Sequence, residues 1–223
     1  MNFRELIHQL RYSEDEVARF NAAEQLIHDK NPEVVLALIG ALGDEDESVQ
    51  GAAMSSLKTG TFDSVPFLRN ALRHEIESIR WGVAELLEFF PDEKTELVLG
   101  SALDDTSPNV RGAAARSLRK MMVTDLTCEK LLSLLNDSDT FPRYEALLTL
   151  ETVRPSLVDE VKIIQRDLYS GHQIERLAAI HFIRRYNKTN WLSDVKNLLQ
   201  DFDPRVKEAA LWTINHLTAT NHE

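Results

Sequence analysis

DDTSPNVRGAAARSL at residues 104–118 is the clearest copy of a pattern that recurs along the whole chain. Its second part begins at Val110, and the other copies begin at Ala18, Val49, Ile79, Pro142, Ile174 and Val206. Consecutive copies therefore start 30 to 32 residues apart. A repeat of nearly constant period in this range indicates stacked structural units that share one core. The sequence predicts a solenoid of seven repeats.

Each repeat has the periodicity of two helices. In the second helix the first, fifth and ninth motif positions are apolar, as in Val110, Ala114 and Leu118, and such positions share one helix face. Small residues beside them, such as Ala22 and Ala23, allow a neighbouring helix to approach closely. The preceding amphipathic helix ends at a leucine seven residues before most copies of the motif, and one residue out of step in two. These leucines are Leu10, Leu42, Leu72, Leu103, Leu135, Leu168 and Leu199.

Polar turns such as GDEDES at 43–48 and QDFDPR at 200–205 separate the two helices of a repeat. Their Asp, Ser and Asn side chains suit the N-cap of the second helix, and Pro108, Pro142 and Pro204 suit its first turn. The same acids could serve as calcium or magnesium ligands, but none completes an EF-hand loop. We therefore predict caps and no metal site.

The segments DDTSPNVRGAAARSL, GDEDESVQGAAMSSL and NDSDTFPRYEALLTL resemble HEAT repeats of the short type first described in phycobilisome lyases. The resemblance extends over residues 2–217. It implies an all-α, right-handed solenoid of about seven helical hairpins that forms one domain over 1–217, with a short tail at 218–223. It also implies that the second helices line a concave face, which in this family usually binds a protein.

In that family the second motif position is commonly an arginine bonded to an aspartate of the neighbouring turn. This chain matches the pattern at four positions, which are Arg19, Arg80, Arg111 and Arg143. Gln50, Glu175 and Lys207 occupy the position in the remaining repeats. The resemblance therefore implies a structural ladder with breaks at repeats two and six.

The net charge of −11 is unevenly distributed. Residues 1–111 hold 10 Lys and Arg against 21 Asp and Glu, whereas the rest of the chain is neutral. An acidic surface attracts cationic partners and repels phosphate backbones, so the N-terminal half favours a basic protein over nucleic acid. Solubility alone would also explain an acidic chain.

No apolar run approaches the roughly 20 residues of a membrane span, and Met1–Tyr12 lacks the apolar centre of a signal peptide. A single cysteine, Cys128, excludes an internal disulfide. It could be a thiol activated at a helix N-terminus or a buried structural thiol, and the usual burial of free cysteine favours the second. We expect a cytoplasmic protein, with a monomer favoured and no membrane association.

The signatures of catalysis are missing from the sequence. Its eight glycines form neither a dinucleotide-binding nor a phosphate-binding loop, and its seven histidines have no metal-ligand spacing. We predict no catalytic residues, no metal and no cofactor.

The exposed face of the second helices is the predicted binding surface. Its third motif positions include Phe20, Trp81 and Tyr144, which alternate with Gly51 and Gly112. Aromatic side chains ringed by charge are typical of protein-binding sites. The candidate partner-binding residues are Phe20, Glu24, Trp81, Glu85, Glu88, Tyr144, Glu151 and Trp212. Alternatively, these rings could pack over the glycines as intramolecular staples.

Three functions compete at this stage. The first is a non-enzymatic interaction module, an adaptor or an immunity-type inhibitor that captures a basic protein. The second, from the resemblance, is a phycobilin lyase or related chaperone. The third is a HEAT-like DNA glycosylase, for which two basic clusters are available, but an isoelectric point near 5.1 argues against DNA binding. The clusters are Arg111, Arg116, Arg119 and Lys120, and Arg184, Arg185 and Lys188.

Overall fold

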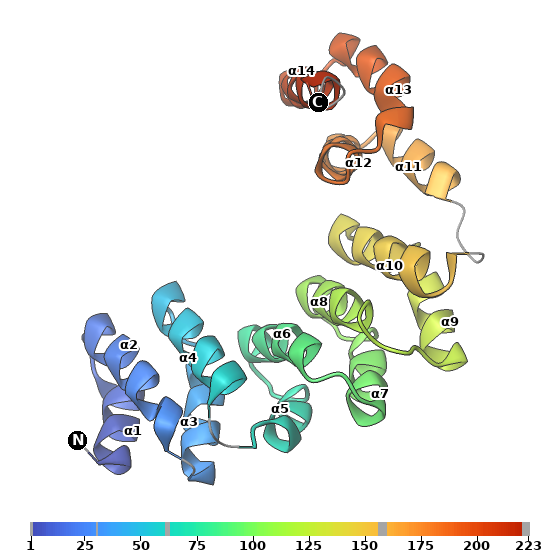
Figure 1. Cartoon of the computed structure of the whole chain (residues 1–223). Helices are drawn as coiled ribbons and strands as arrows, with labels where there is room; N and C mark the ends of the chain where they lie inside the picture. Colours follow the sequence, from blue (N-terminus) through green and yellow to red (C-terminus); the bar gives the residue numbers. More distant parts are fainter. Residues whose placement is uncertain (1, 30, 61–62, 156–159, 220–223) are drawn as a thin grey trace. The chain divides into compact units, whose positions relative to one another are not determined.

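The computed structural model describes residues 2–29, 31–60, 63–155 and 160–219, and its regular structure there is entirely helical (Figure 1). By its internal contacts the chain divides into two compact units, Met1–Ser156 and Leu157–Glu223. A single solenoid over 1–217 stays a prediction. In the described part of the chain, no helix is both long and apolar enough to cross a membrane.

The first unit contains five helical hairpins stacked in two layers (Figure 1). The first helices are α1 (Phe3–Tyr12), α3 (Pro32–Ala41), α5 (Val65–Ala71), α7 (Glu93–Ala102) and α9 (Asp125–Leu134). The second helices are α2 (Glu16–Gln25), α4 (Glu47–Thr59), α6 (Glu77–Leu86), α8 (Pro108–Leu118) and α10 (Thr140–Val153). Short 3-10 segments, η1 (Leu26–His28) and η2 (Leu87–Phe89), continue α2 and α6. Each second helix packs against the next one along the chain.

The second unit contains two further hairpins. They are built from α11 (Glu160–Leu168), α12 (Gln173–Arg185), η4 (Thr189–Trp191), α13 (Leu192–Asn197), η5 (Leu198–Gln200) and α14 (Pro204–Ala219). The second helices α12 and α14 pack against each other. Because α14 continues to Ala219, it includes the start of the expected tail, and residues 220–223 lie outside the described part.

The predicted core stripe is buried. Val110, Ala114 and Leu118 on α8 have no exposed surface, and Val49, Ala53 and Leu57 on α4 are at most 1% exposed. A buried stripe at every third or fourth position explains why the motif spacing repeats so closely.

Buried hydroxyl groups add a contact between second helices that the apolar pattern does not reveal. Ser56 donates to the carbonyl of Ala23 at 2.9 Å, and Ser117 donates to the carbonyl of Ala84 at 2.8 Å. Thr149 makes the same bond to α8 at 2.7 Å. All three occupy the eighth motif position, so in each of these three repeats one small hydroxyl group is satisfied by a carbonyl of the preceding second helix.

Three of the predicted polar turns cap the helix that follows them, whereas Asp139 at the start of α10 makes no capping bond with its side chain. Asp46 accepts hydrogen bonds from the backbone at the start of α4, and Ser107 does so at the start of α8. A second acid earlier in the turn, such as Asp105 or Asp137, accepts the backbone N–H two residues later at 2.8 and 2.9 Å. The carboxylates therefore shape the turns before they contact the neighbouring repeat.

An arginine ladder joins neighbouring repeats along the turns. Arg19 binds Asp44 through two hydrogen bonds of 2.8 and 2.9 Å. The same two-pronged contact joins Arg80 to Asp105 at 2.8 and 2.9 Å, and Arg111 to Asp137 at 2.7 and 2.8 Å. Each of these arginines also donates to the carbonyl six residues before it, which ties it to its own turn.

The expected break at repeat six is wrong, because the sixth motif begins one residue later than its apolar letters suggest. Ile174, aligned with the buried first position, is 72% exposed. Arg176 therefore takes the ladder position, and it binds Asp201 at 2.8 and 3.0 Å.

The interruption at repeat two is real, and both partners are replaced there. Gln50 donates to the carbonyl of Asp44 at 2.6 Å, as a ladder arginine would, but the following turn has His74 where other turns have Asp. Arg143 likewise donates to the carbonyl of Asp137 at 2.6 Å, and the turn after it has Ser170. Four arginines thus face four aspartates, and after the other two positions the aspartate of the turn is replaced by His74 or Ser170.

Candidate functional site

Two adjoining hollows open on the second-helix face of the first unit. One, of about 440 Å³, is lined by Trp81, Glu85, Asn109, Arg116 and Phe141. The other, of about 380 Å³, is lined by Ile76, Glu77, Ser78, Trp81 and Asn109. Because Trp81 and Asn109 line both, we treat the eight residues as one site and name it the Trp81 groove.

Helix α6 supplies the central stripe of the groove. Glu77, Trp81 and Glu85 are four residues apart, so they lie along one face of the helix. The indole is partly exposed and has a carboxylate on either side of it along the helix. This arrangement combines an aromatic surface with two acids, which is the pattern expected of a site for a basic and partly apolar ligand.

Glu77 is held in place by α8. It accepts a 2.6 Å hydrogen bond from the Ser107 hydroxyl and a 3.1 Å bond from the Asn109 amide. These two bonds lower the pKa of Glu77, with a smaller contribution from the charge of Arg80. The carboxylate is therefore ionised and fixed in direction at neutral pH.

Glu85 differs from Glu77 because it is half-buried, with 25% of its side chain exposed. Burial raises the pKa of Glu85, even though Arg116 lies 2.8 Å away and favours the charged form. The nearby carboxylates of Glu88 and Glu145 raise it further. Because burial and the neighbouring acids disfavour the charged form of Glu85, an additional cation beside it would stabilise the carboxylate.

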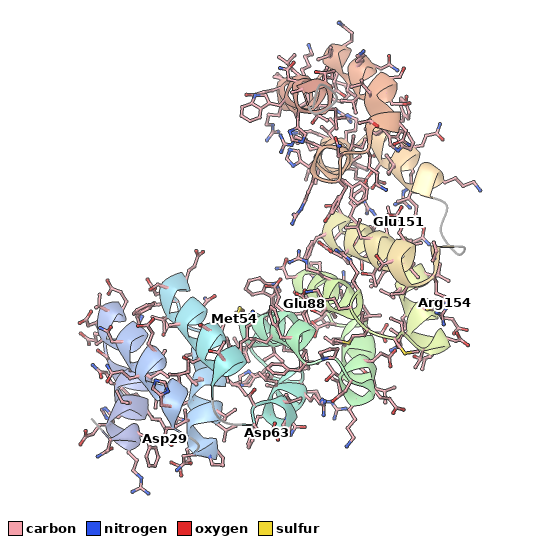
Figure 2. The ribbon with its side chains drawn as sticks, viewed as in Figure 1. Asp29, Met54, Asp63, Glu88, Glu151 and Arg154 are labelled. Atoms are coloured by element: carbon pink, nitrogen blue, oxygen red, sulfur yellow. The ribbon has the colours of Figure 1, made fainter. Side chains whose placement is uncertain are left out.

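Arg116 links Glu85 to a second acid on α10. Its other guanidinium nitrogen lies 3.0 Å from Glu145, and Arg119 lies 2.6 Å from the same carboxylate. Glu145 is only 6% exposed, so these ion pairs hold α8 against α10. Glu88, labelled in Figure 2, pairs with Lys120 at 2.5 Å.

The ring that covers a glycine is Phe141, which the sequence reasoning did not select. A Cβ atom on Gly112 would lie 2.3 Å from two carbons of the Phe141 ring. A Cβ atom on Gly51 would meet nothing within 4 Å. The staple therefore exists at one glycine and not at the other, and neither Trp81 nor Tyr144 makes it.

The predicted site residues do not all gather in one place. Trp81 and Glu85 line the groove, and Glu88 follows on the next turn. Phe20 is partly exposed and Glu24 is exposed on α2, two repeats away. Trp212 is 65% exposed in the second unit, and Glu151 is partly exposed on α10.

Tyr144 differs from the expectation of an exposed anchor, because it is 8% exposed. Every residue from 142 to 150 on α10 is buried, so this helix has no free face at its centre.

Sequence reasoning also missed Glu77, Asn109 and Phe141. The signal for Glu77 was present, since it lies one helical turn before Trp81. Phe141 immediately precedes the fifth motif, and no rule of helix periodicity points it toward α8.

The first of the two basic clusters that could serve DNA binding is neutralised by ion pairs. Arg111 is bound to Asp137, Arg116 and Arg119 to Glu145, and Lys120 to Glu88. Its positive charge is thus engaged within the protein.

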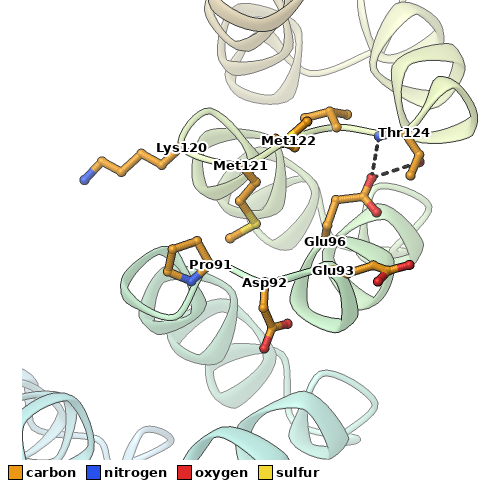
Figure 3. A pocket seen from close by; sticks show the side chains of 9 residues that line it. Pro91, Asp92, Glu93, Glu96, Lys120, Met121, Met122 and Thr124 are labelled. Carbon is orange, nitrogen blue, oxygen red and sulfur yellow. Dashed lines mark hydrogen bonds between the residues drawn. The ribbon is translucent and has the colours of Figure 1, made fainter.

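A further cavity, of about 580 Å³, lies between the start of α7 and the segment joining α8 to α9 (Figure 3). Glu96, which is 1% exposed, reaches from α7 to that segment and accepts bonds from the Thr124 backbone and hydroxyl at 3.0 and 2.9 Å. Met121 and Met122 line the same cavity. Glu96 thus fixes the start of α9, where Thr124 is the N-cap.

Cys128 on α9 is 3% exposed, and burial raises the pKa of its thiol. The alternative of an activated thiol is therefore wrong, and the cysteine is part of the core. Among the described residues, no group of three or more His, Cys, Asp and Glu side chains could hold a metal ion.

Comparison with known proteins identifies the repeat. A family model for HEAT repeats matches residues 3–75 and 65–151. A HEAT repeat-containing taxis protein from Halobacterium salinarum is 33% identical over 130 residues, which is 54% of this chain and 30% of that protein. The chain thus spans less than a third of this relative's length.

Solved structures show the same architecture at low sequence identity. The YibA protein of Escherichia coli superposes with a TM-score of 0.55 at 15% identity, over 98% of this chain and 90% of that one. A chain of the complex of CpcE and CpcF, the phycocyanin lyase of Nostoc sp. PCC7120, gives 0.52 at 21% identity, over 68% of this chain and 99% of that one. With the matched model covering residues 3–151 and the hairpins continuing to Ala219, this chain belongs to the HEAT-repeat family.

Proposed function

We propose that the chain is a non-enzymatic protein-interaction module whose Trp81 groove binds a basic segment of a partner protein. The observation that carries this proposal is the stripe on α6, where an indole lies between two carboxylates and borders two hollows. A lysine or arginine side chain fits such a stripe, because its stem packs on the ring and its charge meets the acids.

The charge distribution supports a basic partner. Residues 1–156 hold 16 Lys and Arg against 27 Asp and Glu, so the first unit carries the whole net charge of −11. Such a field raises the rate of encounter with a cationic protein and weakens as salt is added. Phe20 and Glu24 on α2 belong to the same acidic unit, and we propose them as secondary contacts.

Arg116 gives the groove a way to accept a cation. In the free protein this arginine binds both Glu85 and Glu145. A cation from the partner can take over Glu85 while Arg116 stays on Glu145, which is more deeply buried. The exchange relieves the half-buried carboxylate without leaving a buried charge uncompensated.

The proposal covers an adaptor and an inhibitor equally, since both need only a binding groove. A monomeric, cytoplasmic protein belongs to the same proposal, with the buried free thiol of Cys128 consistent with a reducing compartment. The likeness to phycocyanin lyase subunits reflects the fold alone at 21% identity, so we do not propose bilin chemistry.

The test measures binding of a fluorescein-labelled ten-residue peptide that carries four arginines around one leucine. We expect Trp81→Ala to weaken binding by about tenfold or more, as loss of an aromatic anchor usually does. Glu85→Gln should weaken it by about threefold to tenfold, and the affinity of the unaltered protein should fall with added salt. Glu33→Gln, in which an exposed acid of the same unit outside the groove is changed, is the matched control and should matter by less than about twofold.

Equal losses for Glu85→Gln and Glu33→Gln would mean that only the general acidity attracts the peptide. Unchanged binding by Trp81→Ala with an unchanged circular dichroism spectrum would place the site elsewhere and refute the proposal.

A further inference from the structure

The second unit has a hollow of its own with the opposite chemistry. It measures about 300 Å³ and lies on the second helices α12 and α14. Its lining residues, which we name the Trp212 surface, are Leu177, His181, Arg184, Arg205, Glu208, Ala209 and Trp212. Leu177, His181 and Arg184 follow one face of α12, and Arg205, Glu208 and Trp212 follow one face of α14.

Trp212 is the main apolar element of this surface. It is 65% exposed, which is unusual for the largest apolar side chain on a helix that otherwise packs against its neighbour. Leu211 beside it is 49% exposed. An exposed indole on a polar, hollowed surface is the kind of anchor that protein partners use.

The charged side chains around the indole are mainly cationic. Arg184 and Arg205 lie in the lining with one acid, Glu208. Arg205 has 73% of its side chain exposed, and its contacts are a 2.9 Å bond to Gln173 and a 3.7 Å approach to Asp203. Among the described residues, Arg184 has no ion pair with an acid.

This local excess is not a by-product of overall composition. Residues 157–223 hold nine Lys and Arg and nine Asp and Glu, so the second unit as a whole is neutral. Arg176 and Asp201 neutralise each other in the ladder, so this pair leaves the net charge of the unit unchanged. The cations of the Trp212 surface are therefore concentrated there by the fold.

His181 adds a group whose charge depends on its surroundings. Burial lowers the pKa of His181, and the positive charge of Arg184 lowers it further. The charged groups that line the hollow with it are Arg184, Arg205 and Glu208. An anion bound between Arg184 and Arg205 would favour the protonated imidazole of His181. The histidine would then add a third positive charge to the surface.

We infer that the Trp212 surface binds an acidic segment of a partner protein, with carboxylates on Arg184 and Arg205 and an apolar side chain on Trp212. From the sequence, Trp212 is expected to bind a basic partner, but Arg184 and Arg205 beside it favour an acidic one. Nucleic acid is disfavoured as the occupant because the first unit carries a charge of −11, which repels a long polyanion. This inference does not depend on the Trp81 groove.

The experiment uses the full chain and fluorescence anisotropy with a labelled ten-residue peptide that has four Asp and Glu around one Phe. We expect binding that weakens between 50 and 300 mM NaCl, and weaker binding of the same peptide with Ser in place of Phe. Trp212→Ala should reduce the affinity by about tenfold, and Arg184→Gln and Arg205→Gln by about threefold to tenfold each.

Lys196→Gln is the matched control, since it removes an exposed cation of the same unit outside the surface. It should change the affinity by less than about twofold, and Trp81→Ala should have no effect. Affinity should rise as the pH falls through the pKa of His181, and His181→Gln should remove that rise.

Three results would overturn the inference. The first is equal losses for Lys196→Gln and Arg205→Gln, which would reduce the effect to general charge. The second is tighter binding of a ten-nucleotide single strand than of the acidic peptide. The third is no binding of the peptide at 50 mM NaCl by a protein with an unchanged circular dichroism spectrum.

Discussion

Replacing Asp137 with Asn tests what the arginine ladder contributes to stability. The carboxylate accepts two bonds from Arg111, and Asp139 donates its backbone N–H to it at 2.9 Å. Asparagine keeps an oxygen for that backbone bond, but it loses the charge and turns an amide group toward the guanidinium. The substitution therefore isolates the ion pair from the shape of the turn.

The expected cost follows from the burial of both partners. The side chain of Arg111 is 15% exposed and that of Asp137 is 8% exposed. Removing one partner of a fully buried pair costs about 3–5 kcal/mol, and the remaining exposure of Arg111 lets water solvate part of the orphaned charge. We expect Asp137→Asn to lower the free energy of unfolding of the first unit by about 2–3 kcal/mol.

Asp139→Asn is the matched control on the same turn. Asp139 lies 3.9 Å from Arg111 and its side chain is 52% exposed, so its loss should cost no more than about 0.5 kcal/mol. Urea unfolding followed by Trp81 fluorescence, in a background with Trp191→Phe and Trp212→Phe, reports on the first unit.

The chain itself supplies a rescue. Repeat two has Gln50 at the ladder position and the turn after it has His74, so the double variant Arg111→Gln, Asp137→His copies the residues of a natural interface. It should be more stable than Asp137→His alone. Equal costs for Asp137→Asn and Asp139→Asn would refute the ladder as a source of stability.

Three further predictions rest on single contacts. Burial alone would raise the pKa of Asp137, but the bonds from Arg111 and Asp139 outweigh it and the net pKa is lowered. The ladder's stabilisation is therefore complete above the unfolded value of about 3.9 and is lost as the pH falls through the lower folded pKa. Acid titration of stability should show a shallower loss for Asp137→Asn. Gly112→Ala should destabilise the folded protein by more than about 1 kcal/mol, because the new methyl group would collide with Phe141. Gly51→Ala, whose methyl group would enter open space, should stabilise it by up to about 1 kcal/mol. Thermal unfolding compares the two variants, and the reverse order would contradict the Phe141 contact. Cys128 should react with a thiol reagent at least about 100-fold faster in urea than in the native protein, and fast native labelling would contradict its burial.

The sequence was most informative where one face of a helix repeats. The spacing of Val110, Ala114 and Leu118 predicts the buried stripe, and the polar turns predict the caps, because both depend on residues close together in the chain. The sixth repeat shows the limit of such reading. Ile174 has the right apolar character for the first motif position, yet the arginine that reaches Asp201 sets the register.

The candidate site was harder to predict because it depends on contacts between repeats. The ion pairing of Glu85 depends on Arg116 on α8, which also binds Glu145 on α10. These two residues lie about 30 and 60 positions away from Glu85 in the sequence. A count of acids alone suggested an open acidic face. Side-chain pairing across three helices turns it into a groove with one stripe available to a ligand.

The position of the ladder residues within a repeat bears on how such arrays grow. The fourth and fifth repeats carry both ladder residues, an aspartate on the turn and an arginine six residues later, which are Asp105 with Arg111 and Asp137 with Arg143. A gene duplication that copies such a repeat therefore supplies both the acid and the base of the ladder, so the new copy can form an ion pair with each of its neighbours. Where Gln50 precedes His74, the connection is uncharged, so the array could be divided or joined there without stranding an ion.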